Sequence, residues 1–264
     1  MARVQLGVRW DDDSQNPRLR RARDAGLLDY VEANYPIAPQ ENPEIGGVPT
    51  FVHSPTNAVA SPAGLNRALC EQIRGAAERF ASPWVGEHLC ATGPEQIGRL
   101  GYIVNPILHP ALADVAATNA RALAAYYGRP VALELGPHYQ RVGDYASEMH
   151  FLGDVAERAD CLVLLDIAHW SASNRNLRRA ADYGLDAIDP ARVVELHLAG
   201  LRAGRSGEYW HDAHERLPDE ELLALVLFLA RTLPNVRALT FEHAPDAPEA
   251  DLVATLERLR KELS

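Results

Sequence analysis

The chain has few cysteines and no long hydrophobic run. Its three cysteines, Cys70, Cys90 and Cys161, are scattered, and no Cys-x-x-Cys pair occurs. Neither a disulfide framework nor a zinc ribbon is therefore expected, and Cys161, which opens an apolar run, is predicted to be a buried thiol. No signal peptide, membrane-spanning run, linker, low-complexity tract or repeat is visible. We therefore expect no membrane association and take the cytoplasm as the default compartment.

Positive charge is also scarce. The sequence has 26 Lys and Arg against 36 Asp and Glu, which gives a formal net charge of -10. An acidic protein of this kind repels polyanions, so a role in binding nucleic acid is disfavoured. Hydrophobic residues make up 47% of the 264 positions, which is ordinary for a soluble globular protein with a sizeable core.

Short apolar runs alternate with helical stretches along the chain. The eight strand-like runs are Val4–Val8, Asp29–Glu32, Phe51–His53, Trp84–His88, Val131–Leu135, Leu162–Asp166, Val193–His197 and Leu239–Glu242. They are rich in Val, Leu and Ile without strict alternation, as in strands that are buried on both faces. Helices are predicted at Pro17–Ala25, Ser61–Arg79, Ala111–Tyr127, Asp144–Arg158, Asp219–Leu233 and Pro248–Lys261. Eight such units favour an α/β fold of the closed (β/α)8 TIM-barrel type, as one domain over residues 1–264.

Most of the strand-like runs end in a possible metal ligand. Six of the eight runs have His, Asp or Glu at their ends, and a seventh ends in Glu32. In a parallel barrel the C-terminal ends of all strands meet at one rim, so these residues are expected to converge. A single His at a strand end is more often structural, but the joint pattern predicts a metal site. The candidate ligands are His53, His88, Glu134, Asp166, His169, His197, Asp212, His214 and Glu242.

The ligand types indicate which metals fit. A mixture of imidazole and carboxylate without thiolate suits Fe, Mn or Zn, and nine ligands exceed the need of one ion, so two or three ions are expected. Glu134 is the best candidate for a bridging carboxylate, and Asp166 is a further bridging or ligating candidate. Asp212 and His214 share one face if that piece is extended, in a segment, 201–218, that is otherwise expected to be an irregular loop.

Glu32 and Asn34 stand at the end of the second run. They are candidates for orienting the substrate or for supporting the ligands, and ion-pair or turn roles fit them equally well.

Three segments together resemble a known family. They are Leu165-Asp166-Ile167-Ala168-His169, the run Arg-Val-Val-Glu-Leu-His-Leu-Ala-Gly over residues 192–200, and Asp212-Ala213-His214. The chain resembles the multinuclear non-heme iron-dependent oxidases, the family of the methanobactin-biosynthesis oxidase, from its first strand to Glu242. His53, Glu87-His88 and Glu134 fall where that family has its early ligands, and Glu242 falls where it has its last.

The resemblance implies a barrel of the xylose-isomerase-like kind that holds two or three irons in a mixed Fe(II)/Fe(III) state, with O2 as co-substrate. It further implies that the chain modifies a residue, often cysteine, of a ribosomally made precursor peptide in natural-product biosynthesis. Many family members work with a separate protein that binds the leader peptide, so such a partner is expected here. The family often has Asn where this chain has His169, a stronger ligand, so a third metal position should be better occupied.

Three other classes of function stay open. A trinuclear zinc hydrolase or phosphodiesterase of the apurinic-endonuclease type would use the same barrel and ligand types, although the net charge argues against DNA as a substrate. A sugar isomerase with Mn or Mg is disfavoured by the number of His residues. A non-catalytic metal-binding scaffold would differ from an enzyme in lacking substrate-dependent O2 uptake.

Overall fold

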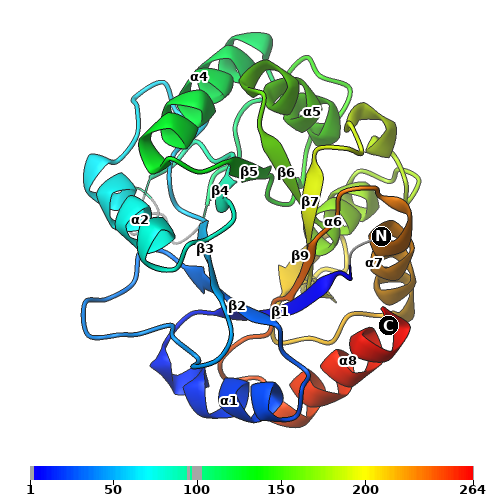
Figure 1. The fold of residues 1–264 in the computed structure, drawn as a ribbon. Helices are drawn as coiled ribbons and strands as arrows, with labels where there is room; N and C mark the ends of the chain where they lie inside the picture. Colours follow the sequence, from blue (N-terminus) through cyan, green and yellow to red (C-terminus); the bar gives the residue numbers. More distant parts are fainter. Residues whose placement is uncertain (1–2, 94–95, 97–102, 264) are drawn as a thin grey trace.

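The computed structural model describes residues 3–93, 96 and 103–263, and within them eight parallel strands close into a barrel (Figure 1). Around the barrel the strand order is β1-β10-β7-β6-β5-β4-β3-β2. These strands are β1 (Gln5–Trp10), β2 (Tyr30–Asn34), β3 (Thr50–Ser54), β4 (Val85–His88), β5 (Val131–Glu134), β6 (Leu162–Asp166), β7 (Val193–Leu198) and β10 (Ala238–Phe241). The predicted TIM barrel is confirmed.

Helices surround the barrel on its outside (Figure 1). They are α1 (Asn16–Asp24), α2 (Arg67–Arg79), α4 (Pro110–Tyr127), α5 (Glu148–Ala159), α6 (Ile167–Asn176), α7 (Glu220–Thr232) and α8 (Glu249–Glu262), with 3-10 turns at η1 (Asp13–Gln15) and η2 (Leu185–Ala187). The connection from β2 to β3, residues 35–49, consists of turns, bends and segments without regular secondary structure. No helix among the described residues combines the length and apolarity needed to cross a bilayer.

Two predicted helices begin later than expected because other residues cap them. The helix expected from Ser61 begins at Arg67, where the side chain of Asn66 accepts a hydrogen bond from the Leu69 amide. Ser61 instead closes a turn by accepting from the Ala63 amide. In the same way α5 begins at Glu148 rather than at Asp144, and the Ser147 hydroxyl caps it. An N-cap side chain satisfies an amide that has no partner within the helix, so each helix begins where such a residue stands.

One helix and one β-hairpin of the structure were not predicted, in addition to the two 3-10 turns. Helix α6 follows β6 without a loop, because Asp166 is both the last strand residue and the N-cap of the helix. Its inner side carries polar residues such as Ser173 and Asn174, so no apolar stripe marks it in the sequence. The segment expected to be irregular contains an antiparallel hairpin of β8 (Gly200–Ala203) and β9 (Trp210–Ala213).

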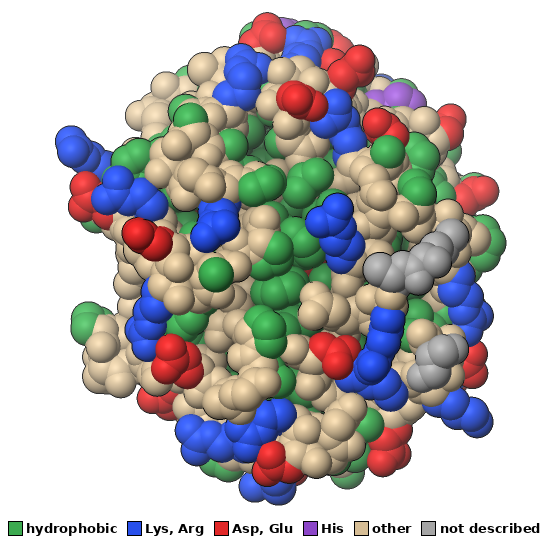
Figure 2. All heavy atoms as spheres, viewed as in Figure 1, with side chains coloured by type: hydrophobic (Ala, Val, Ile, Leu, Met, Phe, Trp, Pro, Cys, Tyr) green, Lys and Arg blue, Asp and Glu red, His purple; other side chains and the backbone are tan. Residues whose placement is uncertain are grey.

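Side chains alternate between the two faces of the barrel wall. Outward residues such as Val52, Leu133 and Leu165 join the large core between the strands and the helices. Inward residues at the first half of the strands form a smaller cluster around stacked Tyr30 and Phe51, whose ring centroids are 4.2 Å apart. Figure 2, in the view of Figure 1, shows hydrophobic side chains gathered at the centre of that face and charged ones around them. The filled floor leaves the opposite end of the barrel for polar inward residues.

Candidate metal centre

Strand register places the candidate ligands beside one another. In the parallel ladders His88 on β4 is the partner of Glu134 on β5, and Asp166 on β6 is the partner of His197 on β7. The register of β6 and β7 shifts between Val163 and Leu164, and this irregularity aligns the last pair. Because partners in register point to the same face, both pairs project into the upper part of the barrel.

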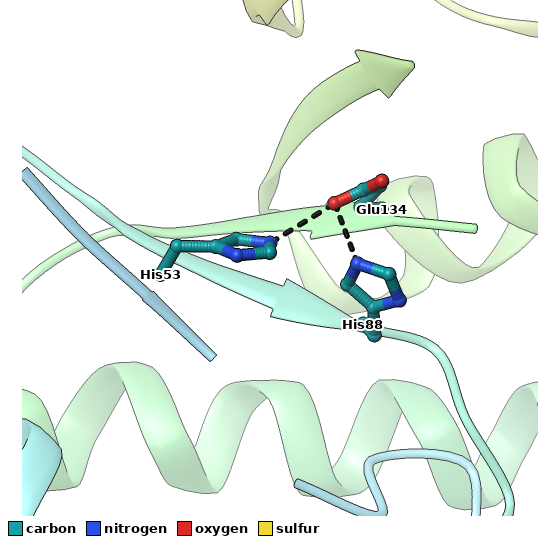
Figure 3. A group of neighbouring side chains, drawn as sticks. All are labelled: His53, His88 and Glu134. Atoms are coloured by element: carbon teal, nitrogen blue, oxygen red, sulfur yellow. Dashed lines mark hydrogen bonds and ion pairs between the residues drawn. The ribbon is translucent and has the colours of Figure 1, made fainter. Parts of the chain in front are cut away.

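Glu134 lies at the centre of the group. Its Oε2 is 3.0 Å from Nε2 of His53 and 2.8 Å from Nε2 of His88, and both rings point toward the carboxylate (Figure 3). Its Oε1 is 2.9 Å from Nδ1 of His169. Three imidazoles from three different elements therefore surround one buried carboxylate.

The described residues form four groups of possible ligands, each with donor atoms that lie within 4.8 Å of one another. One of them, Glu32–Glu195–His197, contains a single ligand predicted from the sequence. The other three consist only of predicted ligands and are His53–His88–Glu134, Glu134–Asp166–His197 and Asp212–His214–Glu242. Glu134 belongs to two of them, as a bridging carboxylate must. His169 lies between groups, with Nδ1 at Glu134 and Nε2 3.6 Å from Oδ2 of Asp212. All nine residues predicted from the sequence are thus brought together.

The third group is built on the hairpin and the last strand. Nε2 of His214 is 2.6 Å from Oδ2 of Asp212 and 3.2 Å from Oε2 of Glu242. Asp212 is in extended β9, so the pleat sends His214 the same way and His211 the opposite way, to the Tyr139 hydroxyl at 3.0 Å. The structure places Glu242, which falls where the family has its last ligand, beside Asp212 and His214.

The donor atoms fit metal ions better than they fit one another. Within the described residues, six buried atoms of the candidate ligands make no hydrogen bond: Nδ1 of His88, Oε1 of Glu134, Oδ2 of Asp166, Nδ1 of His169, Nδ1 of His197 and Oδ1 of Asp212. Glu134 Oε1 and His169 Nδ1 are 2.9 Å apart without the angles of a hydrogen bond. Donors that share one ion at bonds of about 2.1 Å and right angles lie roughly 3 Å apart. The spacing is therefore that of ligands around a common ion.

Neighbouring polar groups fix the orientation of these rings. Nδ1 of His53 lies 2.7 Å from Oδ1 of Asn34, which leaves Nε2 facing Glu134. Nε2 of His197 lies 3.1 Å from Oε1 of Glu32, so its Nδ1 faces Glu134 and Glu242. Both residues contact a candidate ligand directly, which is the position of a group that sets the tautomer of a metal-binding histidine.

The electrostatics of the centre favour positive charge. Burial would lower the pKa of His169 and would raise that of Glu134, but the charged neighbours of each residue outweigh the effect of burial. The pKa of His169 is therefore raised, chiefly by Asp166, and that of Glu134 lies well below its usual value, chiefly because of His88. For His214 burial is likewise outweighed, by Glu242, and the pKa rises to about 10. Protons on these histidines occupy a place that cations would fill.

Three residues of the region were missed or misplaced by the sequence reading. Nη1 of Arg9 contacts the His214 ring and lies 3.4 Å from Oε1 of Glu242. In the sequence, Arg9 follows the predicted first strand by one residue. Glu195, two residues before His197 and so on the same face, accepts from Trp84 Nε1 at 2.6 Å in the barrel floor. Glu87 faces away from the centre, as strand alternation requires, and accepts from the Tyr127 hydroxyl at 2.7 Å. Strict alternation from the known strand ends would have found all three positions.

The chain is similar to a known protein family and to several UPF0276 relatives by sequence. Residues 43–263 match the family model described as RiPP precursor modification enzyme MbnB/TglH/ChrH. A UPF0276 protein of Caulobacter vibrioides is 30% identical over 250 residues, which cover 94% of this chain and 83% of the relative. Another UPF0276 protein, of Rhizorhabdus wittichii, is 27% identical over 212 residues, 80% of this chain and 75% of the relative.

Among solved structures, D-psicose 3-epimerase from Clostridium cellulolyticum H10 superposes with a TM-score of 0.65 at 12% identity, over 99% of this chain and 100% of that one. A xylose isomerase-like TIM barrel protein from Mycobacterium smegmatis in complex with magnesium gives 0.60 at 12% identity, over 99% and 96%. These likenesses establish a xylose-isomerase-like barrel. The family match, together with the assembled ligand rim, shows that this chain belongs to the family of RiPP precursor modification enzymes MbnB/TglH/ChrH.

Proposed function

We propose that this chain is an O2-dependent oxidase that holds two or three iron ions and modifies a residue, cysteine as the first candidate, of a ribosomally made precursor peptide. The observation that carries the proposal is the shared position of Glu134 in two adjoining ligand groups. Membership of the family supports a precursor peptide as the substrate. A cytoplasmic location and a separate partner protein that binds the leader peptide belong to the same proposal.

Three positions would hold the ions. His53, His88 and Glu134 would form one, Glu134, Asp166 and His197 a second, and Asp212, His214 and Glu242 a third. His169 lies close enough to Glu134 and Asp212 to serve the positions on either side. Iron bound there would supply one-electron chemistry with O2 and an open position for a donor atom of the substrate.

The chain's own residues would bind and orient. Asn34 and Glu32 would hold the His53 and His197 rings with one nitrogen toward the ions. Arg9, partly buried beside Glu242, would keep a fixed positive charge at the edge of the centre. Oδ1 of Asp11 lies 2.8 Å from Nε of Arg9 and accepts a hydrogen bond from Nδ2 of Asn34 at 3.0 Å. Asp11 therefore connects Arg9 with Asn34.

Metal analysis is the first experiment. Protein purified without oxygen from iron-supplemented cells should contain two to three irons per chain and should consume O2 when a cysteine-containing precursor peptide is added. Iron below one per chain would remove the proposal.

Zinc at a similar stoichiometry, with hydrolysis and no O2 uptake, would instead support the zinc hydrolase. That function remains the second candidate, because imidazole and carboxylate donors without thiolate also suit zinc.

A further inference from the structure

Two cavities open onto the candidate metal centre, and they differ in character. One, of about 410 Å³, is lined by charged residues that include Arg9, Asp11 and Glu242. The other, of about 620 Å³, lies between the chain after β4 and the chain after β5. Both are lined by His88, Ile103 and His169, so the ligand rim is the wall they share. A substrate held at the centre can therefore extend into either cavity.

The larger cavity is mainly apolar away from the histidines that it shares with the metal centre. Its lining includes Val104, Pro106 and Pro137, and no Asp, Glu, Lys or Arg is among the described residues that line it. Three further lining residues are left uncovered, with Ile107 53%, Val142 45% and Tyr139 40% exposed. Large apolar side chains exposed together beside a reactive centre are typical of a ligand site.

Hydrogen bonds hold the walls of this cavity in place. Nδ2 of Asn105 donates to the Pro137 carbonyl at 2.8 Å and ties the two loops together. The Leu108 amide donates to the Val142 carbonyl at 2.8 Å. On the far side the Tyr139 hydroxyl is 3.0 Å from Nδ1 of His211 on the hairpin. A cavity with fixed walls binds without the entropic cost of ordering its loops.

We propose that this cavity binds an aliphatic or aromatic side chain of the substrate peptide, from a residue next to the one that reacts. The inference rests on the proposed peptide substrate and adds a sequence preference to it. A volume of about 620 Å³ is within the usual range for a site that encloses a small ligand, and it accommodates more than one side chain. A charged residue at that place in the peptide would lose its hydration without gaining a partner.

Peptide binding without turnover tests the proposal. The probes are fluorescein-labelled peptides Gly-Gly-X-Cys-Z-Gly-Gly, with Leu, Phe, Ser, Asp or Lys at X or Z, added to the iron-loaded protein in the absence of O2. Fluorescence anisotropy should give at least tenfold tighter binding for Leu or Phe than for Ser, Asp or Lys at one of the two flanking positions. Equal binding of all peptides would overturn the proposal.

Variants separate the cavity from the rest of the surface. Ile107→Asp and Val142→Asp should each abolish the preference, whereas Ile107→Leu should keep it. Phe228→Asp, at a side chain on α7 that is 58% exposed and outside the cavity, is the matched control and should bind as the unchanged protein does. A preference that survives both Asp variants would overturn the proposal.

The same peptides distinguish failure of the cavity from failure of the proposed function. O2 is admitted after the binding measurements. If no peptide is then oxidised, the oxidase proposal fails. The proposed apolar site still stands in that case, provided that the binding preference was seen and was lost in the Asp variants. If the peptides are oxidised but show no preference at either flanking position, the oxidase proposal stands and the proposed apolar site is wrong.

Discussion

The imidazole of His53 lies directly against Gly86 on the neighbouring strand. The two residues are register partners, and a Cβ at position 86 would come within 2.5 Å of Cδ2 of His53. Carbon atoms do not approach that closely, so any side chain at position 86 must displace the ring. The glycine is therefore a condition for the position of His53 beside Glu134.

Gly86→Ala should weaken the metal position that contains His53. We expect at least a tenfold loss of affinity for the first ion, because a ligand ring is displaced, while the fold is kept. Anaerobic iron titration followed by equilibrium dialysis would measure it. Gly75→Ala on α2 is the control, since a Cβ there meets nothing within 4 Å, and it should bind metal normally. Normal metal binding by Gly86→Ala would contradict the assignment of His53.

Glu134→Ala should remove most of the bound iron from a protein that stays folded. The reason is that this carboxylate is shared by two ligand groups, so its loss affects both. Elemental analysis and circular dichroism would measure iron and fold together. Glu71→Ala, at an exposed side chain on α2, should leave the iron content unchanged. Retained iron and activity in Glu134→Ala would exclude a bridging role.

Asn34→Ala should lower metal affinity about 10- to 100-fold, the usual effect of losing a group that orients a ligand. Asn34 accepts from Nδ1 of His53 and keeps Nε2 toward Glu134. Asn34→Asp retains an acceptor oxygen and should recover most of the affinity. Isothermal titration calorimetry would measure the metal affinity of both variants. Equal losses of affinity in Asn34→Ala and Asn34→Asp would show that Asn34 does not act through the His53 tautomer.

Arg9→Gln should bind the third ion more tightly and should be less stable without metal. Burial would lower the pKa of Arg9, but Glu242 and Asp11 outweigh it, so the guanidinium stays charged beside the third group. Removing that charge favours a cation at Asp212, His214 and Glu242, and in the metal-free protein it takes away one of the positive charges that balance the carboxylates. Thermal unfolding with and without iron would measure both effects. Arg9→Lys should resemble the unchanged protein, and a loss of metal in Arg9→Gln would reverse the interpretation.

Glu87→Gln should reduce the loss of stability at high pH. Burial is the main reason that the pKa of Glu87 rises from 4.5 to about 8 in the folded protein. Below pH 4.5 the Glu87 carboxyl group is protonated in both the folded and the unfolded protein. Between 4.5 and about 8 only the unfolded chain loses this proton, so the free energy of unfolding falls by up to about 1.4 kcal/mol per pH unit.

Glutamine keeps an acceptor for the Tyr127 hydroxyl and cannot ionise. Urea denaturation of the metal-free protein at about pH 5, 7 and 9 would give the pH dependence, with Glu215→Gln on the surface as control. Parallel curves for Glu87→Gln and the unchanged protein would show that Glu87 does not titrate in this range.

The sequence predicts the barrel and the convergence of the six candidate ligands at its strand ends because both follow from strand periodicity. Residues at the ends of parallel strands, such as Glu134 and Asp166, meet whatever the detailed packing is. The features that the sequence does not predict depend on contacts between segments that are far apart along the chain. The hydrogen bonds of Asn34 to His53 and the close approach of Gly86 to the same ring require the cross-strand register. Helix α6 escapes prediction because buried polar residues such as Asn174 find partners only in the folded chain.

Asp166 divides its two oxygens between different tasks. Oδ1 accepts from the His169 amide at the start of α6, and Oδ2 has no hydrogen-bond partner among the described residues and faces the centre. A replacement must cap a helix and also ligate a metal, and of the good capping residues only Asp brings a full negative charge. The position is therefore hard to exchange in evolution or in design, because the integrity of a helix and the charge of the metal centre depend on the same side chain.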